Sequence, residues 1–329
     1  MKVLVTGGGG FLGSAICSML VLRGDNVQSI SRNPYAKLNA LGVAQFQGDL
    51  ADKGAIHLAA QGCDAIIHTA AKAGIWGDYN SYYQTNVVGT KNILEVCKSL
   101  SIPKLVYTSS PSVIFNNGDM EGVDESVPYP ESYLTAYPKT KALAEQMVLN
   151  ANDDSLATVA LRPHLIWGPG DNHLVPRILA RAKAGRLRKI GNRMVMVDSV
   201  YIDNAASAHL LALDHLSFHS PCSGKAYFIS NGEPWKLWDL VNEIIRAGNG
   251  RAVDKSVPVS LAYFMGWVFE MTYSLLRIQN EPPMTRFLAK ELSTSHWFNI
   301  SNARKDLGYE PIVSINEGLS RLKASLEKA

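Results

Sequence analysis

The first 22 residues carry the feature that most limits what this chain can fold into. An apolar run at residues 3–5 leads directly into four consecutive glycines, and then into a segment whose apolar residues recur at helical spacing. A buried strand, a glycine turn and a helix in this order are typical of the first unit of a dinucleotide-binding sheet. Gly7 would allow the tight turn, Gly10 would let the backbone approach a pyrophosphate, and Gly13 would let the helix pack on the strand. The expected cofactor contacts in this motif are Gly7, Gly10, Phe11, Leu12 and Gly13.

Strand-like and helical segments continue to alternate through the first half of the chain. This alternation predicts right-handed crossovers and a parallel sheet, with ligands bound at the carboxyl ends of the strands. We therefore expect an α/β protein, with a Rossmann-type doubly wound parallel sheet and a smaller, mainly helical C-terminal substrate lobe. The further strand-like runs cover residues 26–31, 43–50, 63–71 and 104–110. The expected dinucleotide domain covers residues 1–165 and roughly 200–230, and the expected substrate lobe covers residues 166–199 and 231–329.

The segment SISRNP, at the end of the second strand-like run, bears on which dinucleotide is bound. Sites that prefer NAD usually place an acid here to bind the ribose hydroxyls, whereas this chain has Ser31 and Arg32 and no carboxylate nearby. An arginine attracts the 2′-phosphate of NADP, and an acid would repel it. We therefore predict NADP(H), with a surface arginine as the alternative. Asp49, after the third run, would either hydrogen-bond the adenine or cap the helix that follows.

The segment YPKTK, residues 137–141, places a phenol and an ammonium four positions apart. If the segment opens a helix, Pro138 is tolerated, because the first N–H groups of a helix have no partner within it. Tyr137 and Lys141 then share one face. A lysine beside a tyrosine favours the phenolate and so lowers the pKa of the phenol, which makes the pair a proton-transfer device. On spacing alone, a solvated pair remains the alternative.

Composition excludes several other classes of protein. With 47% hydrophobic and 19% charged residues the chain can bury a large core, and its formal net charge of +3 is too small to suggest nucleic acid as the main partner. The four cysteines have no paired spacing, so we expect reduced core thiols in a cytoplasmic protein and no metal site. The first residues run directly into a strand, so no secretory signal is expected.

The motifs TGGGGFLG, GDL, HTAA, TNVVGT, YTSSPSV, YPKTK and ALRPHLIWGPGD occur in one order over nearly the whole chain. This set resembles the extended short-chain dehydrogenase/reductase family. The resemblance implies that Tyr137 is the catalytic acid/base, that Lys141 lowers its pKa and holds the nicotinamide ribose, and that Ser110 hydrogen-bonds the reacting oxygen. Ser109 and Ser112 are alternatives for that serine. The resemblance also implies a structural role for Asn86 and cofactor contacts at Ala70 and Pro163.

The second half of the chain resembles the 3β-hydroxysteroid dehydrogenase-like branch of this family. Sugar-nucleotide members tend to carry an arginine for the diphosphate where this chain has Val197, which implies a less anionic substrate. The stretches AAKAGIWG, AYFISNGEP and EPPMTRFLAKELSTSHWF are similar to bacterial 2-alkyl-3-oxoalkanoate reductases of long-chain olefin biosynthesis. That resemblance implies NADPH-dependent reduction of the 3-keto group of a hydrophobic long-chain β-keto acid. It also implies β-lactone synthetase and β-lactone decarboxylase as partners.

Such a substrate requires an apolar pocket and a cation for its carboxylate. Lys72 and Arg177 are candidates for the cation, with exposed charges as the alternative. Trp76 and Trp167 could wall the pocket, with core packing as the alternative. His68 is expected to be a hydrogen-bonded polar residue at a strand end. The expected substrate contacts are Lys72, Trp76, Ser112, His164 and Arg177.

Residues 257–278 are apolar around most of a helix, but Glu270 interrupts the run and the stretch is short for a bilayer span. No transmembrane span is therefore expected. A lid over an acyl chain, a face in peripheral contact with lipid or a partner, and a core helix remain alternatives. The apolar face in question contains Leu261, Met265, Val268 and Leu275.

Two other functions remain open at this stage. The chain could be an NAD(P)-dependent 3β-hydroxysteroid or sterol dehydrogenase, which Arg32 argues against if NAD is the cofactor. It could also be a non-catalytic protein that senses NADP(H), which the intact YPKTK argues against. A homodimer is expected by analogy with the family.

Overall fold

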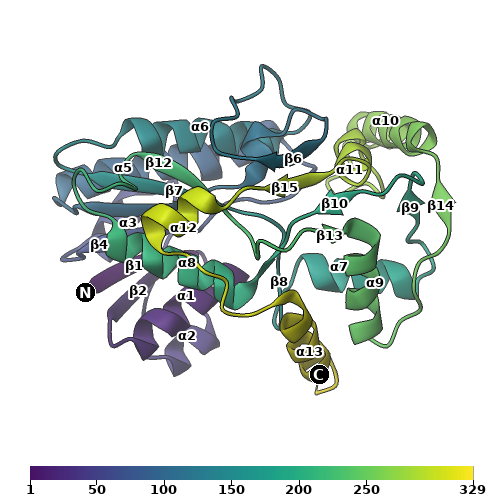
Figure 1. Ribbon diagram of the computed structural model, residues 1–329. Coiled ribbons are helices and arrows are strands. Elements are labelled where there is room, and N and C mark those ends of the chain that lie inside the picture. Colours follow the sequence, from purple (N-terminus) through teal and green to yellow (C-terminus); the bar gives the residue numbers. More distant parts are fainter. Residues whose placement is uncertain (329) are drawn as a thin grey trace.

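A seven-stranded sheet forms the centre of the computed structural model, which describes residues 1–328 (Figure 1). The strand order is β12-β7-β5-β4-β1-β2-β3, and every neighbouring pair is parallel. The order reverses between β1 and β4, so a crevice for a ligand is expected at the carboxyl ends of these two strands. The predicted α/β class and doubly wound parallel sheet are confirmed. The strands are β1 (Lys2–Thr6), β2 (Asn26–Ser31), β3 (Ala44–Gln47), β4 (Ala65–His68), β5 (Lys104–Thr108), β7 (Ala157–Pro163) and β12 (Lys225–Ile229).

Helices cover both faces of this sheet because successive strand residues point to opposite sides. In β1, Val3 and Val5 join one buried cluster with Ile16, whereas Leu4 joins a second cluster with Ile93. Helices α1 and α8 therefore pack on one face, and α3, α5 and α6 on the other (Figure 1). The helices around the sheet are α1 (Phe11–Leu22), α2 (Ala36–Ala40), α3 (Lys53–Ala60), α4 (Tyr79–Tyr83), α5 (Gly89–Ser99), α6 (Ala136–Asn150), α8 (Ile202–His215) and α12 (Ser301–Leu307).

A second group of elements lies beside the carboxyl ends of the strands, on the right in Figure 1. It contains a four-stranded sheet in the order β13-β10-β15-β6, in which β6 precedes β15 by more than half the chain, and two short strand pairs, β8 with β11 and β9 with β14. The strands are β6 (Met120–Val123), β8 (Ile166–Trp167), β9 (Lys189–Ile190), β10 (Met196–Val197), β11 (Val200–Tyr201), β13 (Trp235–Lys236), β14 (Ser256–Val257) and β15 (His296–Phe298). The helices are α7 (Leu174–Lys183), α9 (Leu237–Ala247), α10 (Val259–Leu275), α11 (Arg286–Glu291) and α13 (Ile315–Leu326).

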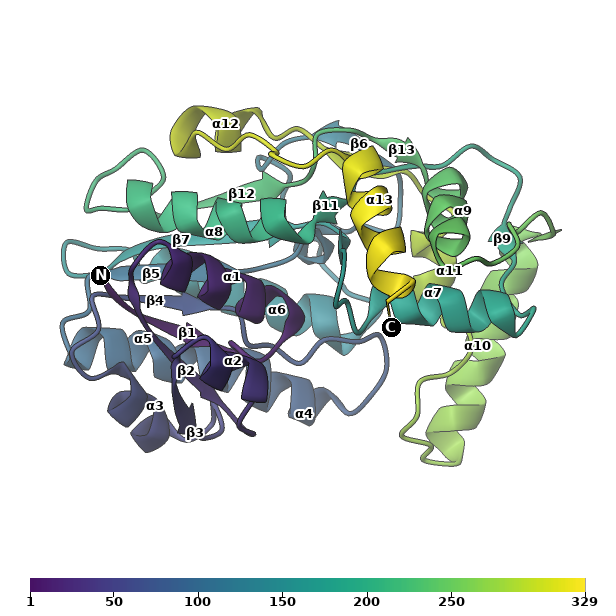
Figure 2. The same ribbon diagram turned by 90° about the horizontal axis from the view of Figure 1, so that it is seen from below.

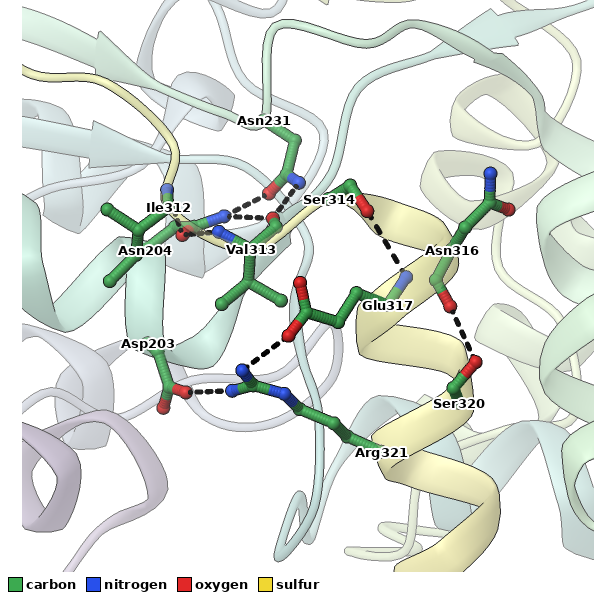
Figure 3. Close-up of polar contacts among 10 residues, drawn as sticks. All are labelled: Asp203, Asn204, Asn231, Ile312, Val313, Ser314, Asn316, Glu317, Ser320 and Arg321. Carbon is green, nitrogen blue, oxygen red and sulfur yellow. Dashed lines mark hydrogen bonds and ion pairs between the residues drawn. The ribbon is translucent and has the colours of Figure 1, made fainter.

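Two buried asparagines tie the C-terminal segment to α8 (Figure 3). The Asn204 side chain accepts hydrogen bonds from the backbone N–H groups of Ile312 and Val313 at 2.9 and 3.0 Å. It also donates to the Val313 carbonyl at 2.7 Å and to Asn231 at 2.9 Å. Arg321 of α13 pairs with Asp203, the residue before Asn204. The segment before α13 is therefore held by side chains of the sheet-covering helix.

An Asn204→Ala variant should lose about 3 kcal/mol of unfolding free energy, because truncation leaves buried backbone groups without partners. Urea unfolding followed by tryptophan fluorescence measures the difference. Asn316→Ala is the matched control, since Asn316 is exposed and only its backbone oxygen is hydrogen-bonded. The control should change stability by less than about 0.5 kcal/mol. Equal effects of the two substitutions would contradict this account of the network.

Helix α10 projects from the molecule, as Figure 2 shows, and only Ala262 and Gly266 within it are buried. The core-helix alternative for residues 257–278 is therefore wrong. Glu270, the one acid in the run, accepts hydrogen bonds from the Arg286 backbone and guanidinium at the start of α11. Among residues 1–328, no helix is both long and apolar enough to cross a membrane. The large exposed side chains on and just after α10 are Leu261, Phe264, Trp267, Met271, Leu275 and Leu276.

Candidate active site

The glycine turn between β1 and α1 has the geometry that its sequence predicted. Gly7 has a φ of +71°, and a Cβ atom there would lie 2.9 Å from the Ala70 Cα atom. A Cβ atom on Gly13 would lie 2.2 Å from the Gly7 carbonyl oxygen. Gly10 precedes α1 and contributes no capping side chain, so the first N–H groups of the helix are free to meet an anion. Ala70 follows β4 and faces the turn, so the residues expected around a pyrophosphate are brought together.

Basic side chains lie near the end of β2, where the adenosine ribose of a dinucleotide is expected. Ser31 donates a hydrogen bond to the Asn33 carbonyl at 2.9 Å, and Arg32 is exposed. Lys37, which the sequence analysis missed, places its Nζ atom 3.3 Å from the Ser14 hydroxyl on α1. Its sequence signal was weak, because a lysine a few residues after the strand is ordinary in a surface loop. These groups can attract a phosphate on the ribose.

Asp49 is exposed and accepts a hydrogen bond from the Ala51 N–H at 2.8 Å. The cap of α3 comes instead from Asp52, whose carboxylate accepts from the N–H groups of Gly54 and Ala55. The capping alternative for Asp49 is therefore wrong, and its carboxylate lies in the turn just before the helix.

His68 is a buried, neutral, structural residue, as expected. Its Nδ1 atom lies 2.6 Å from the Thr6 hydroxyl, and its Nε2 atom lies 3.1 Å from the Thr90 hydroxyl. Burial, with a smaller effect of the Lys141 charge, lowers the pKa of His68 to about 3. Both ring nitrogens are engaged, so His68 has no free group for proton transfer.

Tyr137 lies in the first turn of α6, followed by Pro138 as the spacing predicted. One turn later, the buried Lys141 ammonium donates a 2.6 Å hydrogen bond to the Thr108 carbonyl at the end of β5 and lies 4.1 Å from the centroid of the Tyr107 ring. Ser110 follows β5, and its hydroxyl hydrogen-bonds the Tyr137 phenol. Tyr137, Lys141 and Ser110 therefore meet at the carboxyl end of the sheet.

The pKa values in this group differ from the expectation. Burial raises the pKa of Tyr137 above its usual value, and the hydrogen bond with Ser110 only partly opposes this. Burial lowers the pKa of Lys141 to about 7, against the opposing effect of Glu145. The pKa of Tyr137 is therefore raised in the protein without cofactor, and the expected lowering by Lys141 is not seen. The physical reason is desolvation, which disfavours both the phenolate and the ammonium.

A buried ion pair lies one turn beyond Lys141 and was missed by the sequence analysis. Glu145 receives hydrogen bonds from Arg162 at 2.9 and 2.6 Å and from the Tyr129 hydroxyl at 2.6 Å. The side chains of Glu145 and Arg162 are 0% and 3% exposed. An arginine inside the apolar strand of residues 157–163 was the only sequence signal for this pair. The negative charge of Glu145 also favours the ammonium form of Lys141.

Asn86 occupies a π-helical turn, Gln84–Val88, that joins α4 to α5. Its side chain accepts from the Lys72 N–H at 2.7 Å and donates to the Lys72 carbonyl and to the Thr140 hydroxyl. It therefore links the segment after β4 to α6. This arrangement is consistent with the structural role that the family resemblance implied.

A cavity of about 220 Å³ opens beside Tyr137 and Ser110. Ser112, Pro163 and His164 line it, so five residues expected around the reacting groups share one space. Two polar residues of the lining, Glu291 and His296, were missed because they lie more than 150 residues further along the chain than Tyr137. The apolar part of the wall is Ile75, Phe115, Met120, Leu165, Phe287 and Phe298.

A second cavity of about 460 Å³ lies between α10 and the segment after β4. Trp76 lines it, and the indole N–H donates to the Ile278 carbonyl at 3.1 Å. Met271 of α10 forms part of the opposite wall. Ile75 borders both cavities, so they adjoin at this residue. The first cavity is mainly apolar, whereas Lys139, Glu270 and Arg286 also line the second.

The two predicted carboxylate cations do not line either cavity. The Lys72 ammonium donates to the Ser81 hydroxyl and lies 4.8 Å from the centroid of the Tyr82 ring. Arg177 pairs with Glu281. Each cation already has a partner within the chain, so the prediction that one of them meets a substrate carboxylate is not met by this geometry.

The cysteines and the possible metal-ligating side chains are placed as follows in the fold. All four cysteines are free and buried. Within the described part of the chain, no group of three or more His, Cys, Asp or Glu side chains is placed to hold a metal ion.

Comparisons with known proteins agree with this geometry. The model of the 3-beta hydroxysteroid dehydrogenase/isomerase family matches residues 4–259. A 2-alkyl-3-oxoalkanoate reductase of Stenotrophomonas maltophilia (strain K279a) is 53% identical over 327 residues, which cover 99% of each chain. The sterol-4-alpha-carboxylate 3-dehydrogenase, decarboxylating, of Mus musculus is 32% identical over 325 residues, which cover 97% of this chain and 89% of the mouse protein.

A solved structure extends the comparison to the fold. The crystal structure of the UDP-glucose 4-epimerase of Thermus thermophilus in complex with NAD has a TM-score of 0.75, with 23% identity and 100% of both chains covered. The chain therefore belongs to the 3-beta hydroxysteroid dehydrogenase/isomerase family and is an oxidoreductase of the extended short-chain dehydrogenase/reductase type.

Proposed function

We propose that the protein uses NADPH to reduce the 3-keto group of a long-chain 2-alkyl-3-oxoalkanoic acid to the hydroxyl, as a step in olefin hydrocarbon biosynthesis. The observation that carries this proposal is the 53% identity, over 99% of both chains, to a protein named 2-alkyl-3-oxoalkanoate reductase. The mainly apolar cavity beside Tyr137 supports it, because a substrate of this class is largely hydrocarbon.

In the proposed mechanism, Tyr137 donates its phenolic proton to the carbonyl oxygen as that oxygen gains negative charge. Ser110 holds the same oxygen by a hydrogen bond, which its contact with the phenol makes geometrically reasonable. When bound, NADPH supplies the hydride to the carbonyl carbon. Lys141 holds the nicotinamide ribose and, in its charged form, stabilises the phenolate left after proton transfer. The raised pKa of Tyr137 keeps the phenol protonated before the reaction.

The proposed cofactor site uses the residues of the glycine turn and of the β2 end. Residues 1–165 and roughly 200–230 would form the dinucleotide domain, and residues 166–199 and 231–329 the substrate lobe. The cradle fits a pyrophosphate, because Gly7 and Gly13 leave no room for side chains and α1 begins without a capping side chain. Leu12, Ser31, Asp49 and Pro163 complete the proposed contacts.

Arg32 and Lys37 should determine the preference for NADPH over NADH. Arg32→Ala removes a cation expected at the 2′-phosphate, so we expect KM for NADPH to rise about tenfold and KM for NADH to change by less than about twofold. Steady-state kinetics with each cofactor measures the difference, and Lys37→Ala should act in the same direction. Arg251→Ala, which removes another exposed arginine, is the control. An equal effect of Arg32→Ala on both cofactors would contradict NADPH recognition by this residue.

The function is tested by incubating the purified protein with a synthetic long-chain 2-alkyl-3-oxo acid and each reduced cofactor. Faster consumption of NADPH than of NADH, with formation of the 2-alkyl-3-hydroxy acid, is the expected result. Binding of NADPH without turnover of any carbonyl compound would instead favour a cofactor-sensing protein.

A sterol dehydrogenase is the second candidate, because the mouse relative at 32% identity is named as one. It predicts oxidation of a 3β-hydroxysterol with NAD or NADP and no reduction of the long-chain β-keto acid. The same assay, run in the oxidative direction with a hydroxysterol, separates the two candidates.

Partners and location follow from the proposed pathway. The β-lactone synthetase and the β-lactone decarboxylase would act next on the hydroxy acid, and a homodimer is proposed by analogy with the family. Four free thiols suit the reducing conditions of the cytoplasm. The exposed apolar side chains of α10 would allow peripheral contact with a membrane.

A further inference from the structure

Three titratable side chains line the cavity beside Tyr137 and have no part in the hydride or proton transfer described above. His164 follows β7, His296 lies in β15 and Glu291 ends α11. The two imidazole rings meet edge to face, with their centroids 5.0 Å apart. Most of the remaining wall is aromatic or aliphatic. A polar group set in an apolar wall indicates a ligand with a polar group at that point.

Both histidines are more than nine-tenths buried, and the Nδ1 atom of each has no hydrogen-bond partner in residues 1–328. The Nε2 atom of His296 lies 2.8 Å from the Glu291 carbonyl, to which it donates. His164 hydrogen-bonds the Asp198 backbone. The His296 ring is therefore anchored through Nε2, and each ring keeps a buried Nδ1 atom without a partner in a residue that lines the cavity. A buried polar atom without a partner destabilises the free protein, and a bound group that hydrogen-bonds to it removes that cost.

Glu291 adds a carboxyl group to this pair of nitrogens. Burial raises its pKa to about 7, and Arg177 opposes that shift. A second carboxylate brought beside Glu291 could not remain ionised together with it, because like charges in a desolvated site disfavour each other. A shared proton would remove this repulsion and would also supply a donor for the free nitrogens.

We propose that His164, His296 and Glu291 bind the carboxyl group of the substrate and that one proton from solvent enters the site with it. This inference rests on the proposed function, and it replaces Lys72 and Arg177 as the expected carboxylate contacts. The keto group at Tyr137 and the carboxyl group are separated by one carbon atom in a β-keto acid. Both must therefore lie in the same cavity, and the three side chains share that cavity with Tyr137.

The other charged groups around the three side chains do not neutralise the added carboxylate. Arg177 faces Glu291 but is paired with Glu281. Asp198 is buried beside His164 and accepts a hydrogen bond from the Phe298 N–H at 2.7 Å. Asp119 interacts with His296, but it is paired with Arg193. Tyr137 is affected by the charge of Glu291, and it stays neutral in the resting site.

Calorimetric titration of the protein saturated with NADP⁺ tests the inference. The probes are a long-chain 2-alkyl-3-hydroxy acid and the secondary alcohol of the same chains that lacks the carboxyl group. Titration at pH 8 in two buffers with different ionisation enthalpies counts the protons taken up. We expect about one proton for the acid and none for the alcohol, with affinity for the acid falling about tenfold per pH unit above pH 8.

Matched variants connect the proton to the three side chains. His296→Gln keeps a donor for the Glu291 carbonyl and removes the free Nδ1 atom, and Glu291→Gln removes the titratable carboxyl group. His296→Gln should weaken binding of the acid about tenfold more than binding of the alcohol. Glu291→Gln keeps an N–H donor without the negative charge, so it should abolish the proton uptake and the fall in affinity for the acid above pH 8. His173→Gln, at an exposed histidine, is the control and should affect neither ligand. Absence of proton uptake by the wild-type protein, unchanged proton uptake in Glu291→Gln, or equal losses for both ligands in His296→Gln would overturn the inference.

The same preparations separate this inference from the proposed function. If the wild-type protein reduces the long-chain β-keto acid but shows no proton uptake, only the carboxyl site is wrong. If it reduces neither that acid nor the matching ketone without a carboxyl group, the proposed function itself fails.

Discussion

A Tyr137→Phe variant should reduce the long-chain β-keto acid about a thousand times more slowly than the wild-type protein. General acid catalysis by a positioned side chain contributes roughly 10²–10⁴-fold, and phenylalanine has no proton to donate. The phenol also contacts Ser110, so its loss removes one of two groups that hold the reacting oxygen. The ring that packs at the start of α6 is unchanged, and the fold should therefore be retained. Steady-state NADPH oxidation measures the rate, and fluorescence titration measures NADPH binding.

Tyr133→Phe is the matched control for this experiment. Tyr133 lies four residues earlier, and its hydroxyl donates a 2.9 Å hydrogen bond to the Val113 carbonyl. It lines the second cavity, with Trp76, and is absent from the wall of the cavity beside Tyr137. Removal of this hydroxyl should change kcat by less than about threefold. A Tyr137→Phe variant that retains more than about a third of the wild-type rate would refute the role of Tyr137 as the proton donor.

A Glu145→Gln variant should lose about 3–5 kcal/mol of unfolding free energy. The substitution leaves Arg162 buried without its anionic partner, and the Arg162 side chain is only 3% exposed. The Tyr129 hydroxyl also loses a charged acceptor. Urea or thermal unfolding measures the change. Glu95→Gln, which removes the acid of an exposed pair with Lys53, should cost less than about 1 kcal/mol.

A double variant distinguishes the cost of an unpaired charge from the cost of altered packing. Glu145→Gln combined with Arg162→Met removes both charges, so much of the lost stability should return. If the double variant is as unstable as Glu145→Gln, the loss arises from packing and not from the uncompensated arginine. If Glu145→Gln is as mild as Glu95→Gln, the buried pair does not stabilise the helix that carries Tyr137 and Lys141.

The local parts of the fold and the site could be predicted because short stretches of sequence specify them. The glycine turn needs only residues 6–13, since Gly7 and Gly13 sit where no side chain fits. The relation of Tyr137 to Lys141 needs one helical turn. His68 was expected to be a hydrogen-bonded polar residue because it ends a buried strand, and it bonds two threonines.

Long-range pairings account for what could not be predicted. His296 reaches the cavity because β15 pairs with β6, a contact between segments that no short pattern connects. The partner of Glu145 lies on a different element, and both residues would be assigned to the surface by residue type alone. Lys72 and Arg177 were sensible choices for a carboxylate, but Ser81 and Glu281 engage them in the folded chain.

Helix α10 shows the limit of composition as a guide. Its apolar residues cover most of the helix, which made a core position as reasonable as a lid or a lipid-facing surface. The structure leaves Phe264 and Trp267 about half exposed, at 55% and 45%. Tertiary packing decides whether such a helix is buried, because periodicity cannot distinguish a buried apolar helix from an exposed one.

Isotope transfer is the most direct test of the central claim that this protein is an NADPH-dependent reductase of long-chain 2-alkyl-3-oxo acids. The wild-type protein is incubated with the β-keto acid and NADPH that carries deuterium at C4, with each C4 epimer in a separate reaction. Mass spectrometry of the product should show one deuterium atom at C3 of the 2-alkyl-3-hydroxy acid from one epimer and none from the other. Bound NADPH together with no labelled hydroxy acid from either epimer would contradict the claim.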